Sequence, residues 1–471
     1  MTVSACTSTP VGLSLSNALK QKQSGTINVI CTTTIQVSQT ITLPQVPGFI
    51  INAPSGISTT TGTFFYAIQD PSVTTTTSFR TEGPASVNGK QLTFNPSPNP
   101  LTLTAGVQYA FAFYQLNGPP STQYSLVQNI GVPNVPSTPA FSFDISFVDS
   151  TAGQYYLADR TNASVDVFDV KANKLIGAAK GFKGFPGNNN NAGPNGVVPI
   201  GGGLLAAGDG DSTLKIVNVG SLSVVATQLS AKNPFTGTIP TQVSAGCVNP
   251  AGGETSNAFR LDEMAFDPAD AEVLAINDAD CPPYGTFFSS KAPFNVLGSV
   301  SFGTSFNGVE QPIWDPGTRM FLQANPQTVA NPNGELDMID PHTFHITNVF
   351  PLTVNCIPHG LALGPNEHAV VGCNAPLSQI LIVNATNGQT VASIPGYGGS
   401  DECWYNQGDN RFYCALSSQT PSALLIVIDA GTNQLLGTIT TSTGAHSVAA
   451  DSATNHVFVP QTAIGISVFG Y

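Results

Sequence analysis

Acidic residues, amides and histidines recur at the starts of seven short strand-like segments, and these residue types can bind cations and transfer protons. In chain order the segments start at Phe143/Asp144, Asn195, Asp262/Glu263, Glu310/Gln311, His359, Asp401/Glu402 and His446, with no lysine or arginine among them. Carboxylate and amide oxygens suit Ca²⁺ or Mg²⁺, and an imidazole shifts the preference toward Zn²⁺, Mn²⁺ or Fe²⁺. Carboxylates that face one another raise each other's pKa unless a cation relieves the repulsion. A fold that brought these positions together would therefore attract a cation.

The spacing of these positions predicts such a fold. They lie 42 to 67 residues apart, and each interval holds short apolar stretches such as YYLADR and VDVFDV, or AVVGCN and ILIVNA, separated by Asp, Asn and Gly turns. A repeat of about 40–50 residues with four strands is typical of a β-propeller blade. In a propeller the first strand of each blade lines the central channel. We therefore predict a seven-bladed β-propeller over residues 123–471, with these positions around one channel.

The last repeat supplies only three strands before the chain reaches Tyr471. The segment YSLVQNIGVP, residues 124–133, resembles the fourth strands of other repeats, such as LLGTIT from Leu435. We expect it to complete the last blade and close the ring, because closure removes the exposed sheet edges that promote aggregation.

Residues 1–122 differ from the repeats in composition and in strand pattern. They contain threonine runs and alternating stretches such as IQVSQTITL, and LTLTAGVQYAFAFYQL reads as two strands joined by a glycine turn. This pattern predicts a small N-terminal β-sandwich-like module. The whole chain is expected to be all-β.

The overall composition excludes several classes of protein. The 471 residues carry 15 Lys+Arg against 28 Asp+Glu, a net charge of −13, and only 9% of the chain is charged. So few basic residues argue against a nucleic-acid partner. No apolar run reaches the ~18–20 residues of a membrane helix, so no transmembrane segment is predicted.

Eight cysteines and no C-x-x-C motif favour disulfides over a zinc ribbon. The repeat register predicts the pairs Cys247–Cys281, Cys356–Cys373 and Cys403–Cys414. Cys6–Cys31 is expected as a fourth pair, with a lipoprotein-type cleavage site at Val3-Ser4-Ala5-Cys6 as the alternative for Cys6. Free buried thiols are the alternative for any pair. An even cysteine count and scarce lysine fit an extracytoplasmic location: secreted, periplasmic or on the cell surface.

Several stretches carry a resemblance to a known family. FDISFVD, GPNGVVPI, FRLDEMAFDP, IPHGLALGPN and GAHSVAAD, within residues 124–471, resemble the YVTN/YncE-type propeller proteins of bacteria, which overlap with the gluconolactonase (regucalcin-like) propellers. Gluconolactonase-type propellers hold one divalent metal in the channel with Glu, Asn and Asp ligands. Asn195, Asp262 and Glu310 are similar in residue type, although their order and neighbours are not those of that family's motif.

The candidate site follows from the ring and the resemblance together. The predicted metal ligands are Asn195, Asp262, Glu310, His359 and His446, and the predicted cofactor is one divalent cation, Ca²⁺ or Zn²⁺. The alternative is a channel that only holds ordered water. Adjacent strand residues point to opposite faces, so only one acid of each neighbouring pair can face the channel.

Three functions stay open at this point. The first is a secreted or cell-surface scaffold that binds a small molecule, a surface or further copies of the chain. The second is a lactonase-like hydrolase in which a metal activates water, with Asp401 or Glu402 as general base assisted by His446. The third is metal redox chemistry or metal sequestration through the two histidines. No G-x-S-x-G, H-E-x-x-H or G-x-x-x-x-G-K-[ST] motif occurs, so the sequence leaves open whether the protein is an enzyme.

Overall fold

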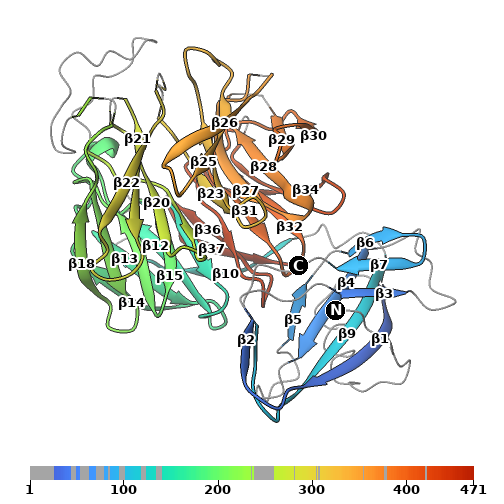
Figure 1. Cartoon of the computed structure of the whole chain (residues 1–471). Helices are drawn as coiled ribbons and strands as arrows, with labels where there is room; N and C mark the ends of the chain where they lie inside the picture. The colour runs from blue at the N-terminus through green and yellow to red at the C-terminus, as the bar shows by residue number, and fades with distance from the viewer. Residues whose placement is uncertain are drawn as a thin grey trace.

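A computed structural model shows an all-β chain (Figure 1). The structure describes residues 26–43, 49–52, 63–69, 79–82, 85–94, 101–117, 124–133, 141–234, 236–237, 259–280, 282–303, 305, 308–353, 355–375, 379–419 and 422–471. The described helical segments are two single 3₁₀ turns, Asn189–Asn191 and Pro365–Glu367. None of the described helices is long and apolar enough to cross a membrane.

Within the described part of residues 125–470 the strands form seven four-stranded antiparallel sheets, which we number as blades. Blade one contains β11 (Ser146–Asp149), β12 (Gln154–Asp159), β13 (Ser164–Asp169) and β14 (Lys174–Lys180); blade two contains β15 (Val197–Gly201), β16 (Leu204–Gly208), β17 (Thr213–Asn218) and β18 (Ser223–Leu229); blade three contains β19 (Met264–Asp267), β20 (Glu272–Asn277), β21 (Tyr284–Ser289) and β22 (Val296–Ser301). Blade four contains β23 (Pro312–Asp315), β24 (Met320–Asn325), β25 (Glu335–Asp340) and β26 (His345–Pro351); blade five contains β27 (Pro358–Leu363), β28 (His368–Cys373), β29 (Gln379–Asn384) and β30 (Thr390–Pro395). Blade six contains β31 (Cys403–Asn406), β32 (Arg411–Leu416), β33 (Leu424–Asp429) and β34 (Gln434–Thr440); blade seven contains β35 (Ala449–Ala450), β36 (Val457–Gln461), β37 (Gly465–Gly470) and β10 (Ser125–Ile130).

The first strands of the blades form a closed circle. Each contacts the first strand of the next blade, and β35 of blade seven contacts β11 of blade one. This arrangement confirms a β-propeller with its first strands innermost. Strand order within a blade follows the chain except in blade seven, where the order is β10-β37-β36-β35.

Aspartates at the ends of first and third strands explain the tight turns between strands. Each accepts hydrogen bonds on one carboxylate oxygen from the backbone N–H groups two and three residues later, the pattern of an Asx turn. The residues are Asp149, Asp169, Asp267, Asp315 and Asp429, at donor–acceptor distances of 2.7 to 3.4 Å. These side chains end the strands and start the hairpins.

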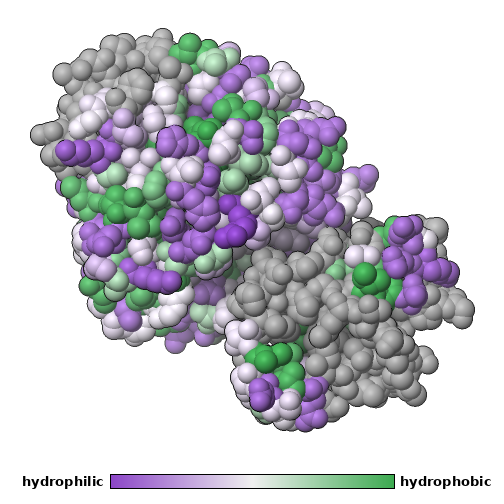
Figure 2. All heavy atoms as spheres, in the orientation of Figure 1, coloured by the Kyte–Doolittle hydropathy of each residue, from purple (hydrophilic) through white to green (hydrophobic). Residues whose placement is uncertain are grey.

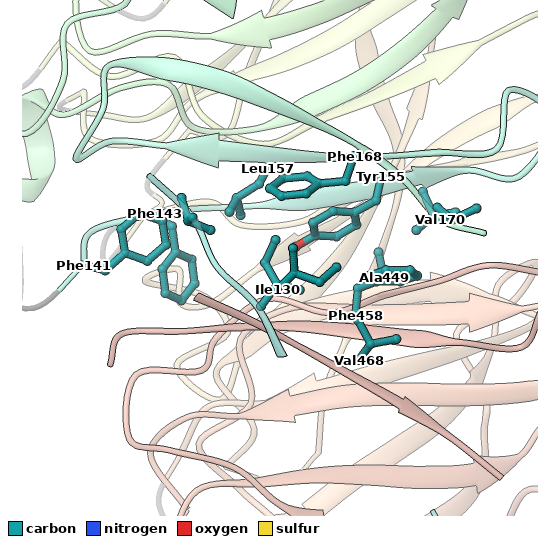
Figure 3. Close-up of a cluster of buried hydrophobic side chains, with 13 residues drawn as sticks. Ile130, Phe141, Phe143, Tyr155, Leu157, Phe168, Val170, Ala449, Phe458 and Val468 are labelled. Atoms are coloured by element: carbon teal, nitrogen blue, oxygen red, sulfur yellow. The ribbon is translucent and has the colours of Figure 1, made fainter. Parts of the chain in front are cut away.

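Apolar side chains fill the space between neighbouring blades. Figure 3 shows the cluster between blades one and seven, where the rings of Tyr155 and Phe458 stack with centroids 4.9 Å apart. Ile130 of the closing strand β10 joins the same cluster. Burying each such side chain contributes roughly 1.5–3 kcal/mol, so this core holds the two ends of the ring together.

A polar cluster reinforces the same closure. The buried Arg411 guanidinium lies over the Tyr471 ring at 4.1 Å and the Tyr124 ring at 5.4 Å, and Arg411 donates a hydrogen bond to the Tyr124 hydroxyl. Its Nε lies 4.0 Å from Asp409 Oδ2, and the Tyr413 hydroxyl donates to that oxygen. Tyr124 precedes β10 and Tyr471 follows β37, so Arg411 of blade six ties down both strands that close blade seven.

The N-terminal strands form three separate sheets. The strands are β1 (Thr26–Gln36), β2 (Ile41–Leu43), β3 (Phe49–Asn52), β4 (Thr63–Gln69), β5 (Phe79–Glu82), β6 (Ala85–Asn88), β7 (Gln91–Phe94), β8 (Leu101–Leu103) and β9 (Gln108–Asn117), and the sheets are β1-β9-β4-β5, β3-β7-β6 and β2-β8. Phe94 of one sheet and Phe113 of another are buried with ring centroids 5.3 Å apart. The two sheets therefore share an apolar contact, as in a sandwich.

Two of the four predicted disulfides lie within the described residues. Cys356–Cys373 and Cys403–Cys414 are both bonded, and all four cysteines are buried. Cys6, Cys247 and Cys281 lie outside the described residues, so the other two pairs stay predictions.

The exposed apolar residues of the propeller lie among hydrophilic ones on the face seen in Figure 2. The exposed apolar residues of the blades lie mainly on fourth strands, among them Leu126, Ile176, Val225, Val349 and Val391.

Candidate functional site

Five of the polar residues singled out in the sequence occupy equivalent backbone positions, just before the first strands of their blades. Their N–H groups donate to a carbonyl near the end of the second strand of the same blade, at 2.7 to 3.0 Å; the residues are Asp144, Asn195, Asp262, Glu310 and Asp401. Because the first strands are innermost, this shared hydrogen bond places all five side chains at the same level of the central channel.

Three of the residues singled out in the sequence converge most closely, and they come from the consecutive blades four, five and six. Ligand atoms of Glu310, His359 and Asp401 all lie within 4.8 Å of one another. His359 Nδ1 is 3.3 Å from Asp401 Oδ1 and 3.5 Å from Glu310 Oε1. The side chains of Glu310 and His359 are 14% and 13% exposed, and that of Asp401 is 31% exposed. The cluster is sheltered but open to the channel on the Asp401 side.

The pKa values of these three side chains depend strongly on one another's charges. Burial raises the pKa of Glu310 to about 7, against the opposing charge of His359 and with support from the nearby acids Asp278 and Asp401. Burial alone would lower the pKa of His359, but the Glu310 charge and the hydrogen bond to Asp401 raise it to about 9. Burial would raise the pKa of Asp401, yet the hydrogen bond to His359 and the charge of His446 leave it below its usual value. The cluster thus retains protons that an incoming cation would displace.

Asn374 also belongs to this cluster. Its Nδ2 lies 2.9 Å from His359 Nε2 and 3.2 Å from Nδ1. The amide nitrogen contacts both nitrogens of the imidazole, so it restricts the orientation of the ring.

A second group of channel residues surrounds Arg160. Its guanidinium donates to Asn195 Oδ1 from Nε at 3.0 Å and from Nη2 at 2.7 Å, and it forms an ion pair with Asp144. His446 Nε2 lies 3.5 Å from the other Asp144 oxygen, and the His446 ring stacks on Phe143 with centroids 4.5 Å apart. Burial would raise the pKa of Asp144, but the charges of Arg160 and Arg260 and the hydrogen bond to His446 together lower it. Asn195 and Asp144 are therefore already engaged by a cation of the protein.

A third group surrounds Arg260. Arg260 Nη2 lies 2.6 Å from Asp262 Oδ2 and also pairs with Asp278, whose other oxygen accepts the Val309 N–H at 3.1 Å. Burial holds the pKa of Asp262 well above its usual value, although Arg260 opposes that shift. The Asp262 carboxyl is nevertheless in direct contact with a basic residue of the protein.

The expectation that no basic residue balances the ring is therefore wrong. Arg160 and Arg260 both reach the channel level and pair with its acids. Arginine has a long side chain, so it can fill a channel from a backbone position outside the predicted ring.

The residues that follow the ring positions have a different role. Glu402 Oε2 accepts hydrogen bonds from the Ser447 hydroxyl and from the Val448 N–H at 3.1 Å, and Ser447 Oγ in turn accepts the Ser146 N–H at 2.9 Å. Each side chain thus binds the first strand of the next blade. Burial keeps the pKa of Glu402 well above its usual value despite these bonds. Glu402 fastens blades six and seven together and does not join the Glu310–His359–Asp401 cluster.

Glu263 is the exception among these fastening residues. The matching position in the next blade is Pro312, which has no N–H to donate, and Glu263 Oε2 is buried without a hydrogen-bond partner. Burial and the Glu310 charge hold the pKa of Glu263 well above its usual value.

Of the five predicted metal ligands, the structure brings Glu310 and His359 together. It places the other three, Asn195, Asp262 and His446, in contacts with Arg160, Arg260 and Asp144. Of the three predicted catalytic residues, Asp401 joins Glu310 and His359, whereas Glu402 and His446 lie in other contacts.

Sequence reasoning missed Arg160, Asp278 and Asn374. All three occupy one register, the first residue after the second strand of blades one, three and five. A search for polar residues at that second position in every repeat would have found them.

The comparisons with known proteins support the fold. No family model matches the chain, and no curated protein matches it either. Among solved structures, the WD40 β-propeller domain of Doa1 is similar, with a TM-score of 0.53 and 12% sequence identity over 74% of this chain and 97% of that chain. At this identity the likeness supports a β-propeller fold and carries no information on activity.

Proposed function

We propose that the protein is a β-propeller scaffold whose channel binds one divalent cation through Glu310, His359 and Asp401. The observation that carries the proposal is the convergence of these three side chains from consecutive blades, with ligand atoms within 4.8 Å. The matching acids elsewhere in the channel form ion pairs with arginine, whereas among the described residues the ion-pair partner of both Glu310 and Asp401 is His359. An imidazole can give up its proton to a cation, which an arginine does not do, so this is the part of the channel best suited to bind one.

The donor set favours zinc-like cations over calcium. One imidazole nitrogen with two carboxylates suits Zn²⁺ or Mn²⁺, whereas Ca²⁺ takes six to eight oxygen ligands. Atoms bound to one tetrahedral Zn²⁺ at ~2.0–2.1 Å lie roughly 3.3–3.4 Å apart. The two distances from His359 Nδ1, 3.3 and 3.5 Å, are close to that separation.

Cation uptake should release protons. His359, with its pKa raised to about 9, carries a proton at pH 7, and that proton must leave before the nitrogen can bind a cation. Titration calorimetry in buffers of different ionisation enthalpy measures this release. Glu310, with its pKa raised to about 7, adds about half a proton at pH 7, so we expect about 1.5 protons per Zn²⁺ bound.

The direct test is elemental analysis and calorimetry of the purified protein equilibrated with Zn²⁺ and with Ca²⁺. We expect one Zn²⁺ per chain, and Glu310→Gln should remove it. Glu272→Gln, at the start of β20, is the matched control and should bind as the parent does. If no metal is retained and neither ion shifts the thermal unfolding midpoint, the proposal fails.

Lactone hydrolysis is a second candidate. Three protein ligands would leave a coordination position free, as in catalytic zinc sites. A cation held there would polarise a carbonyl and acidify bound water. Hydrolysis of a small lactone should then require added Zn²⁺ and be lost in Glu310→Gln. A parent protein that binds Zn²⁺ but does not hydrolyse a lactone series would leave only the scaffold function.

We further propose that the protein works outside the cytoplasm, as the YVTN/YncE-type resemblance implies. The two buried disulfides support this setting, because such bonds persist in oxidising compartments. The N-terminal sheets, within residues 1–122, are proposed as the attachment or assembly module. A chain that starts at residue 123 should lose surface attachment or self-association. If the shortened chain localises and assembles as the parent does, this role is wrong.

A further inference from the structure

We propose that Gln311 is a positioning residue that aligns the three strands carrying Glu310, His359 and Asp401. This inference rests on the proposed cation site and deepens it. Gln311 follows Glu310 directly, and its carboxamide contacts the backbone beside each of the other two ligands.

The contacts of the carboxamide are specific. Gln311 Oε1 accepts the Leu361 N–H at 2.6 Å and the Cys403 N–H at 3.1 Å, and Nε2 donates to the Cys403 carbonyl at 3.1 Å. The Gln311 N–H donates to the His359 carbonyl at 3.3 Å. One residue of blade four therefore binds the backbone of blades five and six. The backbone groups that it binds belong to Leu361, two residues after His359, and Cys403, two residues after Asp401.

This reach sets Gln311 apart from its counterparts. Glu402 and Ser447 occupy the same position in blades six and seven, and both bind backbone N–H groups of the adjacent blade alone. Gln311 extends past the adjacent blade to the one after it. The difference occurs at the cation cluster, where three strands rather than two must be held in register.

A missing side chain at Gly360 makes this reach possible. A Cβ at Gly360 would lie 2.3 Å from the Asp401 carbonyl oxygen and 2.7 Å from Cys403 Sγ. The backbone next to His359 therefore lies directly against the backbone of Asp401. The Gln311 carboxamide bridges this contact, so the separation of the ligands is set before a cation arrives.

Preorganisation of this kind affects affinity and coordination geometry. Residues that orient metal ligands typically change metal affinity by about 10–100-fold when they are removed. A residue that only stabilises the fold would lower the unfolding midpoint without changing the coordination of a bound ion.

The test compares Gln311→Met with Ser447→Ala in the full chain. We measure the Zn²⁺ dissociation constant by calorimetry, the visible absorption of bound Co²⁺, and the thermal unfolding midpoint. Gln311→Met removes every side-chain hydrogen bond at similar volume, and we expect affinity to fall at least about tenfold with an altered Co²⁺ spectrum. Ser447→Ala removes the bond from the Ser146 N–H between blades seven and one and the bond that the Ser447 hydroxyl donates to Glu402 between blades six and seven, and we expect a lower midpoint with both cation readouts unchanged.

A second variant, Gln311→Glu, tests the inference if Gln311→Met does not fold. Gln311→Glu keeps an oxygen for the two N–H groups but loses the donor to the Cys403 carbonyl, so we expect an affinity between those of the parent and Gln311→Met. If a folded Gln311→Met, or Gln311→Glu where the first variant does not fold, binds Zn²⁺ and Co²⁺ as the parent does, the inference is overturned. A parent that binds no cation overturns the proposed function itself.

Discussion

Replacing the buried Arg411 by methionine should strongly destabilise the closure of the propeller. Arg411 and the Asp409 side chain are each about 1% exposed, and removing Arg411 would leave Asp409 buried without its cation. Breaking one partner of a buried ion pair costs about 3–5 kcal/mol. The lost contacts with the Tyr124 and Tyr471 rings add up to ~2 kcal/mol for a desolvated cation over aromatic faces.

The double variant Arg411→Met/Asp409→Asn separates these contributions. It removes the uncompensated charge of the Asp409 carboxylate. In the parent chain Asn406 Nδ2 donates to Asp409 Oδ1 at 2.8 Å, and the amide oxygen of an asparagine at position 409 can still accept that bond. We expect it to recover about half of the loss, because much of the single-variant penalty is the uncompensated charge.

The assay is guanidinium unfolding followed by tryptophan fluorescence, since Trp404 packs against the core between blades six and seven. The reasoning is refuted if Arg411→Met loses less than ~1 kcal/mol, or if the double variant is no more stable than the single one. The first result would mean that the aromatic and apolar contacts alone hold the closing strand, and the second would mean that the uncompensated Asp409 charge is not the source of the loss.

Three further predictions concern buried acids and disulfides. Burial and a neighbouring acid raise the pKa of both Asp166 and Asp337 to about 8, so these carboxyls stay protonated in the folded chain while the unfolded chain ionises near pH 4. Their contribution to stability is complete below about pH 4 and is lost as the pH rises to about 8. The thermal unfolding midpoint should therefore be lower at pH 8 than at pH 5, and an equal or higher midpoint at pH 8 would contradict this. Replacing Cys403 and Cys414 by alanine removes a crosslink of 11 residues and should cost about 3 kcal/mol in denaturant unfolding; a loss below ~1 kcal/mol would show that the unfolded chain gains little freedom. Pro312→Ala supplies an N–H for Glu263 Oε2, which has no hydrogen-bond partner among the described residues, so the raised pKa of Glu263 should fall and the variant should lose less stability than the parent as the pH rises; an unchanged pH profile would show that the two groups do not meet.

The repeat pattern predicted the propeller because each blade buries the same kind of apolar strands and ends them with the same Asx turns. Alternation along a strand also explains why Asp401 lies with His359 while Glu402 binds the next blade. These are local effects of backbone geometry, and sequence periodicity reports them directly.

The pairing of charges within the channel could not be predicted in the same way. Asn195 and Asp262 occupy ring positions like that of Glu310, yet each is bound by an arginine that starts outside the ring. Which acid an arginine reaches depends on the length and direction of its side chain across the channel. Of the seven predicted ring positions, the candidate site therefore comprises those whose acids form an ion pair with histidine and not with arginine among the described residues.

The strand that closes blade seven also has a mechanical consequence. Ser125 at the start of β10 pairs with Gly470 at the end of β37, so tension on the preceding chain would load this hydrogen-bonded pair first. Antiparallel strands pulled from one end separate one pair at a time. The Tyr124–Arg411–Tyr471 stack covers the pair at which separation would begin. If the N-terminal sheets attach to a surface, this stack sets the force at which the ring opens.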